Sequence, residues 1–124
     1  MLAKSDIESA LDAAHARQVA LIESLDDTRL AVPYHPGINP PVWEGGHAAF
    51  FYETFLLRPW LGRPPLMPGM DPVWDSFDID AEDRWRPGMV PVRLSTLAYM
   101  DQVRGLVLDC LETRSLTPGD LYLY

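Results

Sequence analysis

The sequence predicts an all-α protein: an up-and-down helical bundle with a long ordered loop between its second and third helices. Apolar residues recur at three- to four-residue spacing in three stretches of the 124-residue chain, as they do in amphipathic helices. Prolines and capping residues mark the ends of these stretches. Between the second and third stretches lie about 35 residues without helical or strand periodicity, and a loop of that length inside a compact domain is usually functional. It holds seven of the twelve prolines.

The first helix is expected from Ser5 to about Asp27. Ser5 and Glu8 have the spacing of a capping box, in which each side chain bonds to a backbone N–H near the other. His15 lies beside the apolar stripe, and we interpret it as a boundary residue. The stripe itself consists of Ile7, Leu11, Ala14, Leu21, Ile22 and Leu25.

The second helix follows a linker at residues 28–38. Asn39 has the side chain of an N-cap, and the two prolines after it suit a first turn, where a missing N–H costs nothing. The helix is expected to run to about Arg58 and to be stopped by Pro59.

A third helix is expected from a cap at Ser95 or Thr96 to about Arg114. Cys110 belongs to its apolar stripe, so we interpret this thiol as a core residue rather than a nucleophile. Residues 117–124 have the pattern of the start of a fourth helix. We expect the long loop to pack over one end of the helices through its aromatic residues, which are Trp60, Trp74, Phe77 and Trp85.

Composition argues against several classes of partner. The net charge is −8, and the ten Lys and Arg residues are scattered, so we expect no nucleic-acid partner. The apolar runs are far shorter than a membrane span, and the first residues do not form a signal peptide. The single cysteine excludes an internal disulfide. We therefore expect a cytoplasmic protein.

His47 is the main candidate for chemistry. Helical spacing places it on one face with aromatic residues, so its side chain is expected to point inward. Gly45 and Gly46 beside it each cost roughly 1 kcal/mol relative to alanine, which indicates close approach of another backbone, a cofactor or a bulky neighbour. A hydrogen-bonded core histidine is the default, because a metal site needs three or more donors. The other members of this face are Trp43, Phe50, Phe51 and Thr54.

Several charged residues could assist His47. Glu44 could orient its imidazole as an acceptor, and Glu53 lies further round the helix; either carboxylate could instead be solvated. Arg84 and Arg86, on a proline-bounded turn, are a candidate carboxylate clamp or neutralise the acidic run before them. That run lacks the order of an EF-hand, and we interpret it as a solvated loop. Its members are Asp71, Asp75, Asp78, Asp80, Glu82 and Asp83.

Residues 40–59, PPVWEGGHAAFFYETFLLRP, resemble a helix of a known family. They look like the SPxxWHLGHxxWFxExFLL helix in the DinB-like N-terminal domain of the sulfoxide synthases that make ergothioneine, ovothiol and selenoneine. The likeness continues through WDSFDIDAEDRWRPG and RLSTLAYMDQVRGLVLDCL to the final LYLY, so it covers nearly the whole chain.

The resemblance implies that His47 is one of three histidine ligands to non-haem iron(II). The other two belong to an H-x3-H pair on the fourth helix, and the chain ends before that pair would occur. We therefore expect residues 1–124 to be a single DinB-like domain, incomplete at its C-terminus and without the formylglycine-generating-enzyme-like domain of the family. Such a chain would hold iron weakly and would be inactive alone.

The family's reaction joins a thiol or selenol donor to the imidazole ring of a histidine betaine with O2. Arg84 and Arg86 resemble the arginines that grip the carboxylate of the donor. Two alternatives stay open. One is a stand-alone DinB-like thiol transferase that uses a divalent metal. The other is a non-catalytic helical domain that self-associates through uncovered helix faces.

Overall fold

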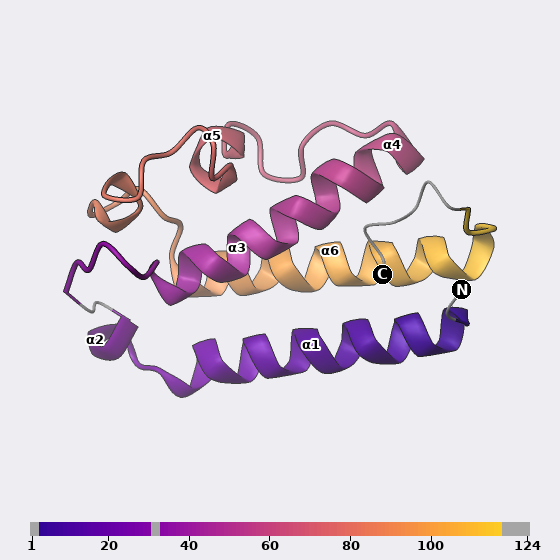
Figure 1. Ribbon diagram of the computed structural model, residues 1–124, viewed down its shortest axis with the longest axis horizontal. Helices are drawn as coiled ribbons and strands as arrows, with labels where there is room; N and C mark the ends of the chain where they lie inside the picture. The colour runs from indigo at the N-terminus through magenta and orange to yellow at the C-terminus, as the bar shows by residue number, and fades with distance from the viewer. Residues whose placement is uncertain (1–2, 31–32, 118–124) are drawn as a thin grey trace.

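A computed structural model describes residues 3–30 and 33–117, and all of its regular structure within them is helical (Figure 1). The predicted all-α class is confirmed. The frame consists of α1 (Lys4–Ser24), α3 (Pro41–Tyr52) and α6 (Arg93–Thr113). The predicted start of a fourth helix falls mainly in residues 118–124, which lie outside the described part of the chain. Short turns complete the fold: α2 (Asp27–Leu30), α4 (Arg58–Leu61), α5 (Asp71–Trp74) and the 3-10 turn η2 (Asp83–Trp85).

Helix α1 runs antiparallel to α6. Lys4, at the start of α1, donates a hydrogen bond to the carbonyl of Arg114 just after α6, and Arg93 at the other end donates to the carbonyl of Leu25. Arg104 pairs with Asp12 at 2.9 Å near the middle. Hydrogen bonds, an ion pair and apolar contacts therefore hold α1 along the length of α6 (Figure 1).

The capping box expected at the start of α1 does not form. The helix begins at Lys4 with Ala3 as its N-cap, and no side chain caps it. The carbonyl of Ala3 accepts from the N–H of Ile7, so Ser5 already lies inside the first turn. Of the predicted apolar stripe, Ile7 and Ile22 are buried, whereas Leu21 is 58% exposed.

The second long helix passes through Pro59, so the prediction that Pro59 ends it is wrong. A π-helical turn, η1 (Glu53–Leu57), follows α3 directly, and the N–H of Arg58 bonds to the carbonyl of Glu53. Pro59 has no N–H to donate. Because the wider turn comes just before it, Pro59 lies in the first turn of α4, where an N–H donor is not needed. The helix ends instead at Gly62, whose φ of 61° is left-handed.

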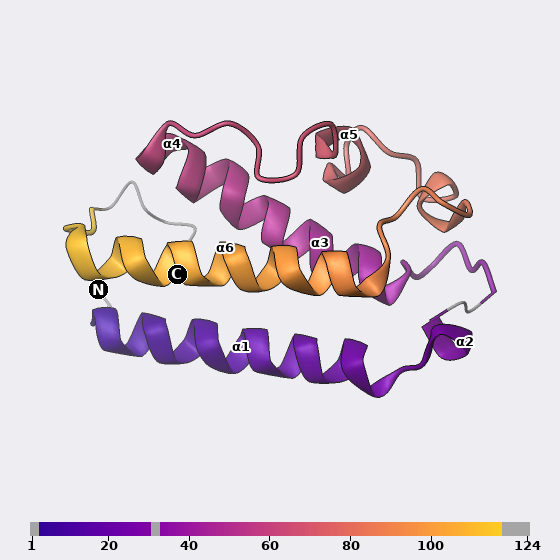
Figure 2. The same cartoon turned by 180° about the vertical axis from the view of Figure 1, so that it is seen from behind.

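Helices α3 and α6 run in the same direction. Gly45 lies against Met100 near one end of the pair, while Leu57 and Leu106 line a common hollow further along both helices. Residues 62–92 carry the chain from the end of α4 back to the start of α6, and both ribbon views show this segment on the outer side of α3 (Figures 1 and 2). Helices α1 and α3 therefore run in opposite directions, as in an up-and-down bundle, whereas the parallel helices α3 and α6 are joined by a crossover connection.

The long segment lies along α3 rather than over one end of the bundle (Figure 1). Its strongest anchor is Trp74 in α5, which is 1% exposed and stacks on Tyr99 of α6 with ring centroids 6.2 Å apart. Phe77 was expected to be a second anchor, but it is 98% exposed, so that prediction is wrong. Trp85 packs edge-on against Tyr34 at 6.1 Å.

The two glycines beside His47 are explained by bulky neighbours. A Cβ added to Gly46 would lie 2.2 Å from ring atoms of Trp74, and one added to Gly45 would lie 2.7 Å from Sδ of Met100. At Gly46 the neighbour is a rigid indole, so only a residue without a side chain allows α5 to approach α3 this closely. At Gly45 the neighbours are the flexible ends of Met100 and Ile22. The sequence left open whether a backbone, a cofactor or a bulky neighbour lies against these glycines, and the structure shows bulky side chains there.

Replacing Gly46 by alanine should destabilise the protein by about 1–3 kcal/mol, because the new methyl group cannot fit beside the rigid indole of Trp74. Urea denaturation followed by circular dichroism measures this difference. The matched control is Gly105→Ala in α6, where an added Cβ meets nothing within 4 Å. That variant should be more stable than the unmodified protein by up to about 1 kcal/mol. Equal effects of the two substitutions would contradict the packing argument.

Candidate functional site

His47 is held in one orientation by two contacts. Its ring stacks on Trp43 with centroids 4.6 Å apart and an interplanar angle of 10°. Its Nδ1 lies 2.7 Å from the carbonyl oxygen of Trp74. Because a carbonyl can only accept, Nδ1 carries a proton, and in the neutral imidazole Nε2 is left with its lone pair. Nε2 has no hydrogen bond among the described residues. This is the tautomer of a histidine whose Nε2 is available as a ligand.

The carbonyls that receive these side chains are at the end of α5. The last carbonyls of a helix have no partner inside it. The Trp43 indole N–H donates to the carbonyl of Val73 at 2.7 Å, and His47 donates to that of Trp74. Two side chains of α3 therefore satisfy two terminal carbonyls of α5, and Trp43 is 1% exposed.

Arg84 also reaches Trp43. Its guanidinium carbon lies 4.2 Å from the centroid of the indole, and its nitrogens donate to Asn39 Oδ1 at 2.9 Å and to the carbonyls of Ser76 and Ile79 at 3.1 Å each. The structure thus brings two predicted site residues, His47 and Arg84, onto one tryptophan.

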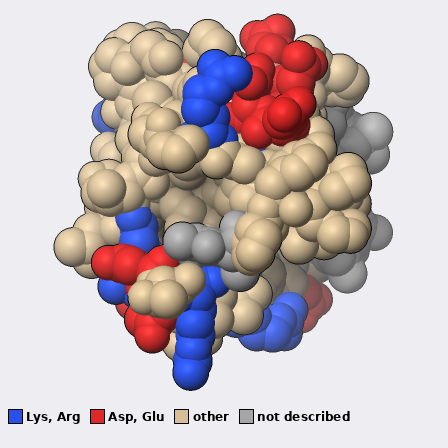
Figure 3. Space-filling model, turned by 90° about the vertical axis from the view of Figure 1, so that its left-hand side faces the viewer, with Lys and Arg blue, Asp and Glu red and all other residues tan. Residues whose placement is uncertain are grey.

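Arg86 does not join this cluster. Its side chain is 63% exposed and pairs with Asp83 at 2.5 Å. On the face drawn in Figure 3, Lys and Arg side chains are interspersed with Asp and Glu, and no basic patch forms there. The pair with Asp83 agrees with neutralisation of the acidic run, the second of the roles considered for this arginine.

Glu44 does not orient the imidazole of His47, contrary to one of the roles considered for it. Its Oε1 accepts a hydrogen bond from Nδ2 of Asn39 at 2.6 Å. The orienting group is the carbonyl of Trp74 instead. Asn39 is correspondingly not the N-cap of α3, which is Pro40, because its side chain is used by Glu44 and Arg84.

The most important polar role not predicted from the sequence is the burial of Glu53. Its carboxylate is 2% exposed, whereas a solvated position was one of the roles considered. The Tyr99 hydroxyl donates to Oε1 at 2.6 Å, and Oε2 accepts from the N–H of Leu66 at 3.0 Å and from Arg58 at 3.1 and 3.2 Å. Arg58 in turn donates to both oxygens of Asp71, at 2.7 and 2.8 Å.

This cluster changes the acidity of its members. The hydrogen bonds that Arg58 donates to Asp71, aided by those to Glu53, raise the pKa of Arg58 above its usual value. Burial, followed by the hydrogen bond to Glu53, raises the pKa of Tyr99. The sequence signal for the cluster was present: Glu53 is a lone charge inside the apolar and aromatic run FFYETFLL.

In the described part of the chain, no group of three or more His, Cys, Asp or Glu side chains could hold a metal ion. His35 Nδ1 accepts from the N–H of Gly37, and His15 Nε2 lies 3.7 Å from Asp101. Burial and the nearby Arg104 lower the pKa of His15.

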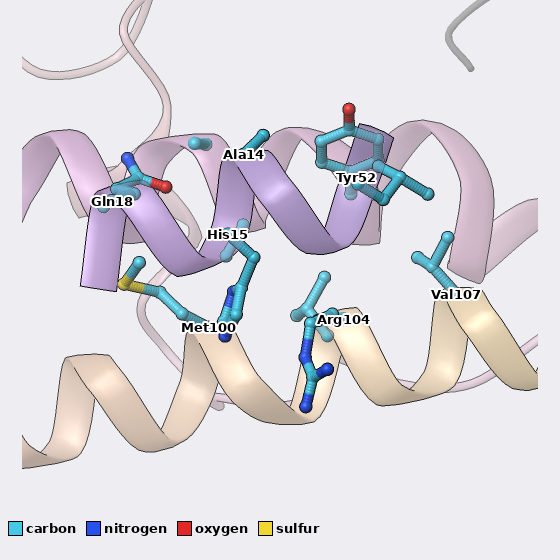
Figure 4. Close-up of a pocket in the computed structure, with 12 residues that line it drawn as sticks. Ala14, His15, Gln18, Tyr52, Met100, Arg104 and Val107 are labelled. Carbon is cyan, nitrogen blue, oxygen red and sulfur yellow. The ribbon is translucent and has the colours of Figure 1, made fainter. Parts of the chain in front are cut away.

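A hollow of about 180 Å³ opens between α1, α3 and α6 (Figure 4). Its walls are mostly apolar, and His15 reaches into it from α1 toward α6. Cys110 lies elsewhere in the core at 6% exposure, and burial raises the pKa of its thiol. Its interpretation as a core residue is confirmed.

Comparison with known families identifies the fold. Residues 10–122 match the family model described as the DinB superfamily. The chain belongs to the DinB superfamily. The DinB-like part of the sequence resemblance is thereby confirmed. A search of curated proteins found no match to this chain. Among its described residues, no helix has the length and apolar character to cross a membrane.

Glu53→Gln should destabilise the protein by about 3–5 kcal/mol, because it leaves the half-buried Arg58 without one of its two anionic partners. The free energy of unfolding in urea measures the loss. The control Glu23→Gln removes the same charge from the exposed face of α1 and should change stability by less than about 0.5 kcal/mol. A difference below 1 kcal/mol between the variants would contradict a structural role for Glu53.

Tyr99 should make stability fall in alkaline solution. Its pKa is higher in the folded than in the unfolded protein, so the folded state keeps a proton that the unfolded state releases above its ordinary value of 10.0. The stabilisation is complete below that pH and is lost as the pH rises above it. Unfolding free energies of the unmodified protein and of Tyr99→Phe should therefore differ by a constant amount below the ordinary value of 10.0 and converge as the pH rises above it. A difference that stays constant above that pH would contradict the assignment.

Proposed function

We propose that this DinB-superfamily chain is the iron-binding part of an ergothioneine- or selenoneine-type sulfoxide synthase. Such an enzyme forms a C–S or C–Se bond on the imidazole ring of a histidine betaine with O2. The observation that carries the proposal is the fixed imidazole of His47, whose Nδ1 proton is bound by the carbonyl of Trp74 at 2.7 Å. Outer hydrogen bonds of this kind are typical of histidines that ligate metals through Nε2.

The residues present fit one ligand of the proposed site. His47 offers an imidazole nitrogen, which is a donor that iron(II) accepts. The described residues do not complete a group of three such donors. In the proposal, the remaining histidines come from outside these residues, in the family pattern H-x3-H. When bound, iron(II) would supply a redox-active Lewis acid for O2 and for the thiol or selenol donor.

The other side chains of the site act on His47 and on the substrate. Trp43 and the carbonyl of Trp74 prevent rotation of the imidazole, which prepares it for a ligand before one arrives. In the proposal, Arg86 binds the carboxylate of the donor with its exposed guanidinium, which would first have to release Asp83. Arg84 would have to release Asn39 to do the same, so in this structure it supports Trp43.

Two other functions make different use of the same chain. A stand-alone thiol transferase would use His47 with a divalent metal and would need no histidine betaine. A non-catalytic interaction domain is favoured by the uncovered apolar surface of α1, where Leu21 is 58% exposed and the hollow shown in Figure 4 opens. That function predicts a dimer that binds no metal.

The reading frame that continues past the codon for Tyr124 provides the first test. We expect it to encode an H-x3-H pair within about one helix length, since i and i+4 positions share a helix face. A frame without such a pair contradicts the sulfoxide-synthase proposal. Product formation from a histidine betaine and a thiol or selenol donor, as opposed to thiol transfer, separates the proposal from a stand-alone thiol transferase.

Substitution of His47 provides the second test, carried out on the complete gene product. His47→Ala should weaken anaerobic iron(II) binding by more than the roughly 10–100-fold that loss of an outer partner costs, and should abolish product formation. His35→Ala is the control, because the side chain of this exposed histidine accepts a hydrogen bond from the N–H of Gly37 within its own loop. Equal iron(II) affinity in both variants would overturn the assignment, and a dimer by sedimentation without metal would support the interaction domain.

A further inference from the structure

Helix α5 is held at both ends by side chains from the second long helix. Its first residue, Asp71, receives two hydrogen bonds from Arg58, at 2.7 and 2.8 Å. Its last residue, Trp74, receives the Nδ1 proton of His47 through its carbonyl at 2.7 Å. The element that orients His47 is therefore also the element that Arg58 grips.

A helix of four residues cannot hold its own position. One turn forms too few hydrogen bonds to compensate for the entropy of ordering it, so tertiary contacts decide where α5 lies. The fork of the Arg58 guanidinium on the Asp71 carboxylate is bidentate, which fixes direction as well as distance. Since only two residues separate Asp71 from Trp74, a displacement at one end must reach the other.

Arg58 is itself fixed rather than flexible. Its Nε and Nη2 both donate to Oε2 of Glu53, a carboxylate that is 2% exposed. Glu53 is held in place by the Tyr99 hydroxyl at 2.6 Å and by the N–H of Leu66 at 3.0 Å. The π-helical turn η1 is the segment between Glu53 and Arg58, so it sets the spacing of this pair. A buried anchor therefore supports the arginine that grips α5.

We propose that Arg58 and Asp71, anchored on Glu53, are positioning residues for His47: they place α5 so that the carbonyl of Trp74 selects the Nδ1–H tautomer of the imidazole. The role of that imidazole as a metal ligand rests on the proposed function above. The tautomer itself does not, since it follows from the contact between Nδ1 and the carbonyl.

Nitrogen NMR of the imidazole tests the proposal without any metal. In the unmodified protein, the ¹⁵N resonances of His47 should show a single tautomer with the proton on Nδ1. Asp71→Asn removes the charged acceptor of Arg58 while keeping its shape, and the two His47 nitrogens should then move toward each other as the second tautomer becomes populated. The control is Asp78→Asn, which removes the same charge from an exposed side chain of the same segment.

Arg58→Lys is the second variant, because it keeps the charge and loses only the fork. It should also mix the tautomers, and in the complete gene product it should weaken iron(II) binding about 10–100-fold, as loss of an outer partner does. A single Nδ1–H tautomer in folded Asp71→Asn or in folded Arg58→Lys would overturn the proposal. Mixed tautomers in both variants together with no iron(II) binding by the unmodified gene product would support the positioning role and contradict only the proposed function.

Discussion

The contact between Trp74 and Gly46 is the constraint on which the rest of the structure depends. The indole is 1% exposed and occupies the place where any other residue at position 46 would carry its side chain. Its Nε1 has no hydrogen-bond partner in the described part of the chain, so shape rather than a polar contact holds the ring. Once the ring is seated, the backbone of the same residue lies beside His47. One tryptophan therefore belongs to both the core and the candidate site, and the close packing of its ring limits where its carbonyl can lie relative to His47.

The elements with clear periodicity were predictable, and the exceptions have local causes. Helix α6 begins at Arg93, two residues before Ser95 and three before Thr96, the two expected caps, and ends at Thr113, close to the expected Arg114. Pro59 misled the prediction because a proline normally ends a helix, and nothing in the composition announces a π-helical turn that shifts the register before it. The course of the long segment was unpredictable for a different reason. Its one buried aromatic, Trp74, is set by contacts with residues far away in sequence.

The orientation of His47 at the candidate site was predictable from the sequence, whereas the groups that hold the imidazole in place were not. The inward orientation of His47 follows from helical spacing, and its contact with Trp43 four residues earlier follows from the same rule. Its polar partner is a backbone carbonyl 27 residues away, and a carbonyl has no sequence signature. The acidic side chain nearest in sequence, Glu44, was the natural choice for that role and has a different partner. Glu53 shows the opposite case, since a charge within an apolar run was a visible sign of a buried network.

The way in which α1 is attached has a consequence for motion. This helix buries two residues, Ile7 and Ile22, in a length of 21, whereas α6 buries seven in the same length. Its other contacts with α6 include exposed ion pairs such as Arg104–Asp12. Ion pairs of this kind contribute little free energy, about 0–1 kcal/mol each. Helix α1 is therefore the part of the described fold that can detach as a unit while α3, α5 and α6 stay together around Trp74. Its amide protons would exchange with solvent through this local opening, and those of α6 would exchange only when the whole domain unfolds.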